Sequence, residues 1–333
     1  MNTRSVIPIL LSAALAGMAR AQGSVNTQCS NPAIVGPGQI GGDACQKALD
    51  LFSYLTPQFG TTLAGGNPVL GQGGAQGGLG KITVELRVNG IMGAIPKVDQ
   101  YDLSAGPAVR TAYQTEDKPF GFPSADGALG LFDGIPVGLT KVLAVDALGS
   151  LTFVPEIDQE GVSIKAPNGS VKVGYGARLG IIKESTLLPS VAVTWLRRDL
   201  PSLDVTAAAT NSDTITVSGL TARSTAWRLV AGKSARMLAV AVGYGKDTYE
   251  SAASLSYALN RSGLRFTPTM PITTAQSPKA TSYFADVMLN LFLVKIVGEI
   301  GRVSTDDIPT YNSFSKKSSD PKLYGAIGLR FGH

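Results

Sequence analysis

Histidine is almost absent from this sequence: the one histidine among 333 residues is His333, at the end of the chain. Serine hydrolases use an imidazole as general base, and histidine is a common ligand of catalytic metals. The sequence therefore excludes hydrolases of the Ser-His type and His-based metal sites. We expect a protein that is not an enzyme, with no catalytic residue, no metal site and no cofactor.

Long apolar runs are missing once the first 21 residues are passed. A membrane-spanning helix needs about 20 apolar residues, and Asn290 and Lys295 interrupt the most apolar stretch of the remaining chain. Basic clusters are missing too. Without Arg4 and Arg20, 27 Lys and Arg residues face 24 Asp and Glu residues, a net charge of +3. This mild balance gives no reason to expect a nucleic-acid partner.

The first 21 residues have the pattern of a secretory signal peptide. Arg4 gives a positive start, residues 6–18 form an uncharged apolar run, and Ala19-Arg20-Ala21 matches a cleavage site before Gln22. The apolar run is too short to cross a bilayer as a helix, so we expect cleavage and export of the mature chain.

The sequence contains two cysteines, Cys29 and Cys45. In an oxidising compartment an isolated pair this close in sequence favours a disulfide, and two thiols without a neighbouring histidine are too few ligands for a metal. The bridge would stabilise a short loop by about 3 kcal/mol. We therefore expect residues 22–80 to form a disulfide-containing N-terminal segment.

This segment has a helical part and a glycine-rich part. Asp43 is a candidate N-cap, and apolar residues such as Leu49 and Phe52 recur at helical spacing up to Pro57. Residues 60–80 are then extremely rich in glycine, which predicts a flexible linker. The helix could plug a barrel or cap its mouth, or the segment could be a loosely attached arm.

Residues 81–333 alternate between apolar and polar side chains with the period of a β-strand. A soluble sandwich would pack the apolar faces together, whereas a transmembrane barrel would turn them to lipid. Strands of about 10–12 residues suit a tilted membrane crossing. Tyr175, Trp195, Tyr244 and Tyr283 lie on the apolar faces, as in interfacial aromatic girdles. We therefore expect an all-β fold, an antiparallel transmembrane β-barrel.

Barrels of this kind have an even number of strands, and the candidates lead us to expect 12 or 14. The candidate strands are residues 81–94, 106–115, 137–145, 148–155, 169–182, 189–199, 204–219 (possible hairpin), 222–233, 236–246, 251–260, 281–291, 292–303 and 322–331. Long polar connections need water on their backbone groups and so lie outside the bilayer. Residues 97–136 are expected as a surface loop, or as a constriction folded into the lumen.

Charged side chains on the polar faces are expected to line the lumen, because basic groups facing lipid cost about 2–4 kcal/mol each. The candidates are Glu85, Arg87, Lys172, Arg178, Arg228, Asp286, Lys295, Glu299 and Arg330. They could select a solute, or they could form salt bridges that fill a narrow barrel. Arg178 and Arg330 have small neighbours on the same face, which leaves space for a solute.

The last strand carries a resemblance. The "GLRFGH" ending, which follows alternating apolar residues from Leu323 to Phe331, resembles the terminal strand of bacterial outer-membrane β-barrels. It implies two partners, the outer-membrane lipids and the barrel-assembly machinery, the latter contacted through the strand ending at Phe331. We therefore expect the cell outer membrane as the location.

Other motifs together resemble an uncharacterised family of such barrels. They are the "LFSYLTPQFG" helix, the "YGARLG" strand before Leu188-Pro189, the "MLNLFLVKIVGEIGRVS" hairpin and the final "YGAIGLRF". The layout is also broadly similar to that of the long-chain fatty-acid transporter barrels, although their hatch sequence is not evident. The resemblance implies a passive channel or transporter for small or hydrophobic solutes. A non-conducting structural or adhesion barrel and a secreted soluble β-protein stay open as alternatives.

Overall fold

The structure is a computed structural model, and it describes residues 23–332 except 98–101, 160, 209–211 and 292. The expected signal peptide at residues 1–21 and His333 lie outside the described residues.

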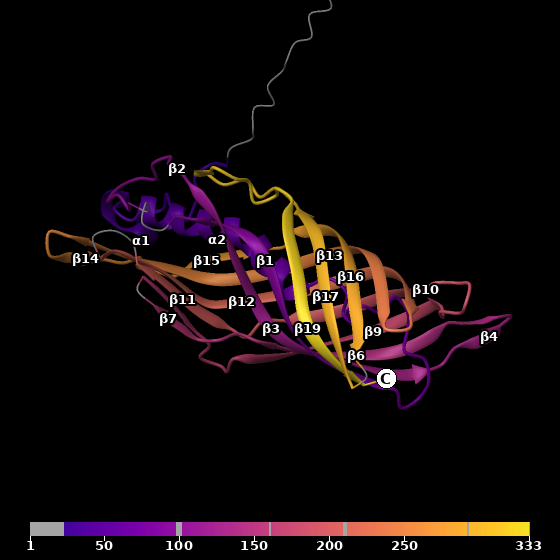
Figure 1. The fold of residues 1–333 in the computed structure, drawn as a ribbon. Helices are drawn as coiled ribbons and strands as arrows, with labels where there is room; N and C mark the ends of the chain where they lie inside the picture. Colours follow the sequence, from indigo (N-terminus) through magenta and orange to yellow (C-terminus); the bar gives the residue numbers. More distant parts are fainter. Residues whose placement is uncertain (1–22, 98–101, 160, 209–211, 292, 333) are drawn as a thin grey trace, which may run out of the picture.

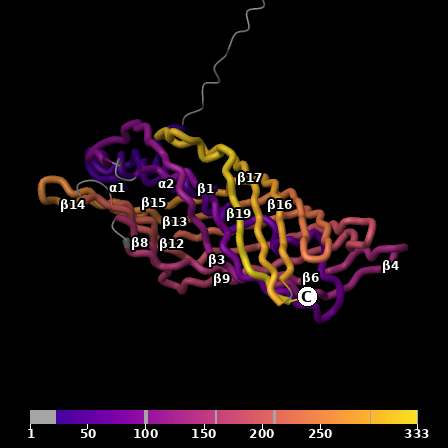
Figure 2. Tube along the Cα trace, viewed as in Figure 1, coloured from indigo at the N-terminus to yellow at the C-terminus, as the bar shows by residue number. Residues whose placement is uncertain are grey.

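The main chain forms a closed antiparallel barrel, drawn in Figures 1 and 2. Within the described residues, ten strands follow one another around the ring, and β12 closes it by pairing with β13. They are β1 (Ile82–Pro96), β3 (Thr115–Phe132), β6 (Ala144–Phe153), β9 (Val171–Ile182), β10 (Ser190–Asp199), β12 (Thr214–Ala235), β13 (Leu238–Arg261), β16 (Lys279–Leu291), β17 (Val294–Thr305) and β19 (Lys322–Gly332). The expected antiparallel barrel is confirmed.

The ring has fewer strands than the 12 or 14 counted from the sequence, because long strands replace pairs of short ones. β12 unites part of the 204–219 candidate with 222–233, and β13 unites 236–246 with 251–260. A bulge between Ser218 and Thr221 shifts the register of β12 against β13. A bulge breaks the alternation of side chains without ending the strand. The sequence pattern therefore predicted two strands where the structure has the single strand β12.

Strand β3 corrects the expectation that residues 97–136 form a surface loop or a constriction. Its prolines, Pro119 and Pro123, lack the N–H group that a sheet interior needs. Pairing of β3 with β6 begins only at Ser124, so the stretch before it is a sheet edge, where proline is tolerated. The candidate strand at 106–115 shrinks to β2 (Ala112–Tyr113), which pairs with β18 (Ser313–Phe314).

One side of the barrel continues beyond the ring as a curved sheet, which we call the cradle. It consists of the far halves of β12 and β13 together with β7 (Ile157–Gln159), β8 (Val162–Lys165), β11 (Leu203–Ala208), β14 (Leu264–Phe266) and β15 (Ile272–Gln276). In Figure 1 the cradle projects from the barrel alongside the N-terminal helices. At the opposite end of the ring, β4 (Ile135–Val137) and β5 (Thr140–Val142) form a small hairpin.

The N-terminal segment packs against the cradle and continues into the lumen. It contains α1 (Pro32–Val35), the short 3-10 helix η1 (Pro37–Gln39) and α2 (Gly42–Ala64). Leu49 and Phe52 of α2 join one buried apolar cluster with Leu255 and Ile272 of the cradle. This burial of an apolar helix face is the main source of stability for a helix in a folded protein.

Two details of α2 differ from expectation. Its N-cap is Gly41 rather than Asp43, and the Asp43 carboxylate instead accepts hydrogen bonds from the backbone N–H groups of Ser104 (2.8 Å) and Val109 (3.1 Å). The helix also runs past Pro57 to Ala64, because its last turns are enclosed by the barrel wall. Cys29 and Cys45 form a disulfide with a Cα–Cα distance of 5.3 Å.

The outer surface of the ring is an apolar belt. Val84, Tyr283 and Ile327 are 45%, 63% and 67% exposed, whereas the intervening charged side chains are buried inside. On β16 the belt runs from Tyr283 to Leu291, which is about 27 Å along a strand and about 20 Å at the usual barrel tilt. The apolar faces therefore point away from one another and outward. Within the described residues, none of the helices is long and apolar enough to cross a membrane.

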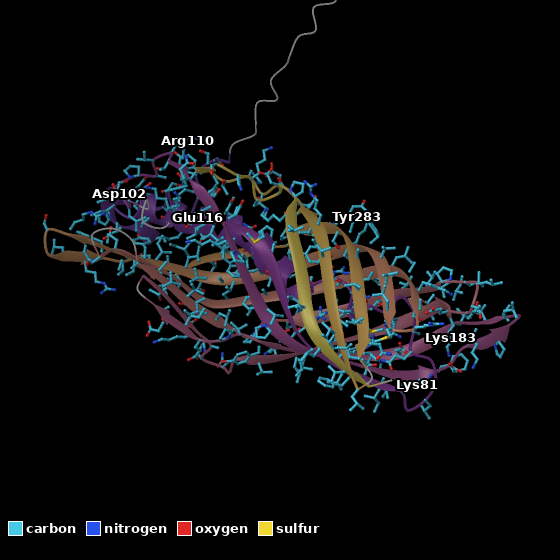
Figure 3. All side chains as sticks on the ribbon, viewed as in Figure 1. Lys81, Asp102, Arg110, Glu116, Lys183 and Tyr283 are labelled. Atoms are coloured by element: carbon cyan, nitrogen blue, oxygen red, sulfur yellow. A yellow bond between two sulfur atoms is a disulfide. The ribbon has the colours of Figure 1, made fainter. Side chains whose placement is uncertain are left out.

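The two ends of the ring differ. Short connections at 183–189 and 236–237 lie at the end where β19 finishes at Gly332, and the longer connections lie at the other end, with the helices. Figure 3 shows Lys81 and Lys183 at the first end and Asp102, Arg110 and Glu116 at the second. We call these the short-connection end and the long-connection end.

Candidate functional site: a plugged lumen

The barrel interior is charged and filled. Seven of the nine predicted lumen residues are buried inside the ring: Glu85, Arg87, Arg178, Arg228, Asp286, Glu299 and Arg330. The other two lie at strand ends. Lys172 is exposed at the start of β9, and Lys295 donates a hydrogen bond to the backbone carbonyl of Gly332 (2.7 Å).

Residues 58–80, which we call the plug, occupy the space between these side chains. The plug comprises the last turns of α2 and the glycine-rich chain that leads to β1, which starts at the short-connection end. Val69 and Leu70 at its centre are buried. The glycine-rich chain was expected as a flexible linker, but it is a defined path through the lumen.

Asn67 is the hub of the plug. Its backbone N–H donates to the Glu299 carboxylate (2.6 Å), and its side-chain amide donates to the Asp286 carboxylate (2.5 Å). Its carbonyl accepts a hydrogen bond from Arg87 (2.7 Å). Asp286 and Glu299 face each other on β16 and β17, so Asn67 supplies N–H donors between two carboxylates that would otherwise repel each other.

The remaining attachments also join wall side chains to the plug backbone. Arg228 donates to the carbonyls of Gly65 (2.7 Å) and Gly66 (2.9 Å), and Arg198 donates to the carbonyl of Ala64. The Leu70 N–H donates to Glu85 (3.2 Å), and the Gln76 N–H donates to Asp146 (3.0 Å). Arg330 binds the Leu70 carbonyl (3.2 Å).

Ion pairs across the wall complete the lining. Arg228 lies 2.5 Å from Asp247, and Arg178 lies 2.7 Å from Asp146. Asp126 is shared by Arg87 (2.8 Å) and Arg198 (2.7 Å). Breaking a buried pair by removing one partner costs about 3–5 kcal/mol, because the other charge stays buried.

Sequence reasoning missed four of these residues: Asp126, Asp146, Arg198 and Asp247. Asp126 lay in the presumed loop, and Asp146 lay in the gap between two candidate strands. Asp247 lay one residue beyond the 236–246 candidate, and the alternation traced through 189–199 stopped at Trp195. Extending the period of two by one or two steps along each strand would have placed Arg198 and Asp247 on the inner face.

The glycines of the plug allow the chain to lie directly against the wall. A Cβ atom added at Gly66 would overlap the Glu299 carboxylate, and one added at Gly73 would overlap the backbone nitrogen of Gly232 on β12. Glycine is therefore required for close approach at these positions.

The loops at the long-connection end hold α2 in place. The Asp50 carboxylate accepts hydrogen bonds from the backbone N–H of Tyr311 (3.2 Å) and from the backbone and side chain of Asn312 (2.8 and 2.7 Å). Burial raises the pKa of Asp50, although these hydrogen bonds oppose the shift. The helix is thus anchored to the connection between β17 and β19.

Open space remains at the short-connection end. A cavity of about 230 Å³ lies between the plug and the wall, lined in part by Gln72, Lys81 and Arg330. Arg330 therefore borders free volume, as its small neighbours suggested, whereas Arg178 is enclosed. Within the described residues, no group of three or more His, Cys, Asp or Glu side chains is arranged to hold a metal ion.

Comparisons with known proteins give no family. The sequence matches no protein-family model and no curated protein. Similar solved structures include the toluene transporter TodX of P. putida (8% identity, 77% of this chain and 91% of that chain, TM-score 0.27) and a FadL homologue of Pseudomonas aeruginosa (9%, 84% and 97%, 0.27). Another is Ail, the attachment invasion locus protein of Yersinia pestis (10%, 77% and 99%, 0.18). These are outer-membrane β-barrels.

Proposed function

We propose that the protein is an outer-membrane β-barrel channel that is closed at rest by its own N-terminal segment. The outer membrane is inferred from the apolar belt, because exposed Val, Leu, Ile and Tyr side chains around a closed ring need a hydrocarbon solvent. We orient the barrel as in other barrels of this kind, with the long connections outside the cell and the short ones in the periplasm.

The observation that carries the channel proposal is the charged lining of the barrel wall around the plug. A barrel that served only as a scaffold could be filled with apolar side chains, which are often as stabilising as buried ion pairs or more so. Side chains such as Arg228, Asp286 and Glu299 instead bind the plug backbone. Water can take over those hydrogen bonds when the plug leaves, which makes this lining suited to a hydrated pore.

The plug is attached in a way that permits release. Many of its contacts with the wall are hydrogen bonds, each contributing about 0.5–1.5 kcal/mol net and somewhat more when a charge is involved. Pro57 removes one hydrogen bond from α2 just before the plug begins. The first part of α2 is fixed by its apolar cluster and by the disulfide. Release would therefore begin after Pro57, with residues 58–80 tethered at both ends.

The lining favours small polar solutes. Both signs of charge line it, grouped on different parts of the ring: the basic side chains Arg178, Arg198 and Arg228 lie on the neighbouring strands β9, β10 and β12, and the acidic side chains Asp247, Asp286 and Glu299 lie on the neighbouring strands β13, β16 and β17. A narrow pore with charged walls selects by size and by field. Apolar solutes and very large solutes are therefore disfavoured.

Planar-bilayer recording tests the proposal through Asn67→Ala. This change removes the side-chain bond to Asp286 while leaving the wall charges intact, and the expected result is at least a tenfold rise in the open fraction over wild type. Asn168→Ala, at an exposed position outside the ring, is the matched control and should behave as wild type. A well-folded Asn67→Ala barrel that stays silent supports the second candidate, a non-conducting barrel, which the filled lumen also fits.

A further inference from the structure

The belt ends in an aromatic girdle on the side of the long-connection end. Tyr244 of β13 pairs with Tyr283 of β16, and their ring centroids are 5.2 Å apart. Trp227 of β12 pairs with Trp195 of β10, whose ring lies 5.8 Å from that of Tyr175 on β9. Tyrosine and tryptophan concentrate where hydrocarbon meets headgroups, so the girdle marks the headgroup level on this side of the barrel.

Two cations face outward at this level. Arg302 of β17 lies directly opposite Tyr283. Lys246 of β13 lies opposite Trp227 on one side and Thr281 on the other, and Ser304 lies opposite Thr281. Lys246, Thr281, Arg302 and Ser304 therefore lie on the same outer face of the barrel as Tyr283. Lys246 and Arg302 are exposed, and their strands are separated only by β16, so their Cα atoms are roughly 10–12 Å apart. Both side chains can reach a group lying over Thr281.

These two cations differ from Arg223 and Arg197 in having no carboxylate partner. Arg223, on the same outer face, lies 2.8 Å from Asp199 and 3.3 Å from Glu250, and Arg197 lies 3.8 Å from Asp199. Within the described part of the chain, no ion pair or side-chain hydrogen bond joins Lys246 or Arg302 to another residue. Two uncompensated positive charges above a hydrocarbon layer form a site for an anion.

We propose that Lys246 and Arg302, with the hydroxyls of Thr281 and Ser304 between them, bind the phosphate of a lipid headgroup in the outer leaflet. The guanidinium of Arg302 offers paired N–H donors that match two phosphate oxygens, and Lys246 adds a point charge. Trp227 and Tyr283 lie beside the two cations, as their partners on the neighbouring strands, and contact the part of the lipid between phosphate and acyl chains. The site rests on the proposed membrane location and orientation but is independent of whether the lumen conducts.

Native mass spectrometry of the full chain in detergent tests the site, with diphosphoryl lipid A as the phosphorylated probe and phosphatidylcholine as the zwitterionic one. Lys246→Ala with Arg302→Ala should lower lipid A retention about tenfold and leave phosphatidylcholine unchanged. The matched control is Lys165→Ala with Arg265→Ala, which removes the same charges from exposed cradle positions and should retain lipid A as wild type does. Heat-modifiable migration on gels confirms that each variant is a folded barrel.

Equal lipid A retention by the wild type and both double variants overturns the lipid site. So does displacement of lipid A by an equal concentration of inorganic phosphate, which would show a site for a free anion. Neither result bears on the channel, because Asn67→Ala reports on the lumen and leaves the outer face unchanged.

Discussion

At the scale of single residues, the glycines show why composition alone misled the interpretation of residues 60–80. A glycine-rich stretch is compatible with a flexible linker and equally with a chain pressed against a wall. Gly66 and Gly73 belong to the second kind, because a side chain at either position would overlap β17 or β12 atoms. The sequence contains no signal that separates the two, since the wall atoms come from strands more than 150 residues away.

We therefore expect Gly73→Val to displace the plug. The added side chain cannot fit beside the backbone of Gly232, so the chain must move off the wall and single-channel records should show frequent openings. Gly149→Val is the control, because an added Cβ at Gly149 meets no atom within 4 Å. Indistinguishable records for the two variants would show that the plug does not lie against β12.

Asp133 predicts a pH effect at the short-connection end. Hydrogen bonds from Lys141 and Lys183 lower the pKa of Asp133 to about 2. A lowered pKa means that the stabilisation is present above the unfolded value of about 4 and is lost as the pH falls through about 2. Since the groups are partly exposed, the effect should stay below about 1 kcal/mol.

Hydrogen exchange of the β4–β5 hairpin between pH 4.5 and 2.5 measures this effect, after correction for the intrinsic rate. Wild type should lose protection toward the lower pH, and Asp133→Asn should be less protected at pH 4.5 and change little. Equal pH dependence in the two proteins would show that protonation of Asp133 does not destabilise the hairpin.

At the scale of elements, alternation identified most wall strands and failed where a local feature hid the pattern. β9, β10, β16, β17 and β19 lie close to their predicted ranges. β3 was missed because Pro119 and Pro123 resemble a loop, and their tolerance depends on where β6 starts to pair. The point where β6 begins to pair with β3 depends on the tertiary structure, so a short stretch of sequence does not reveal it. The same reason hid Asp126, the carboxylate that Arg87 and Arg198 share.

The disulfide makes a prediction for the first part of α2. Cys29→Ser with Cys45→Ser removes a constraint of about 3 kcal/mol on residues 29–45, so amides of α1 and of α2 before Pro57 should exchange faster. Exchange in β16 and β17 should be unchanged, because the ring of hydrogen bonds does not involve the bridge. Uniform acceleration across the barrel would mean that the segment and the ring unfold together.

At the scale of the whole molecule, the account depends on the belt meeting lipid. Ile327→Lys and Val287→Lys place a charge on the outer face of β19 and β16, and each should cost about 2–4 kcal/mol of folding free energy in bilayers if it lies near the midplane. Leu264→Lys on the cradle is exposed to a similar degree and should cost less than about 0.5 kcal/mol. Chemical denaturation in lipid vesicles measures both, and equal costs would argue against a belt in hydrocarbon.

The most direct test of the central claim ties the plug to the wall. A Cβ added at Gly180 of β9 would lie 2.9 Å from the Cβ of Ala75, so Ala75→Cys with Gly180→Cys can form a bridge after a shift of about 1 Å. Both changes are made together with Asn67→Ala, and Asn67→Ala alone controls for reduction of the native disulfide. Planar-bilayer recording should then show a silent barrel when the bridge is oxidised and open events after reductant is added. Equal conductance before and after reduction, with the bridge verified by mass, would contradict a lumen closed by residues 58–80.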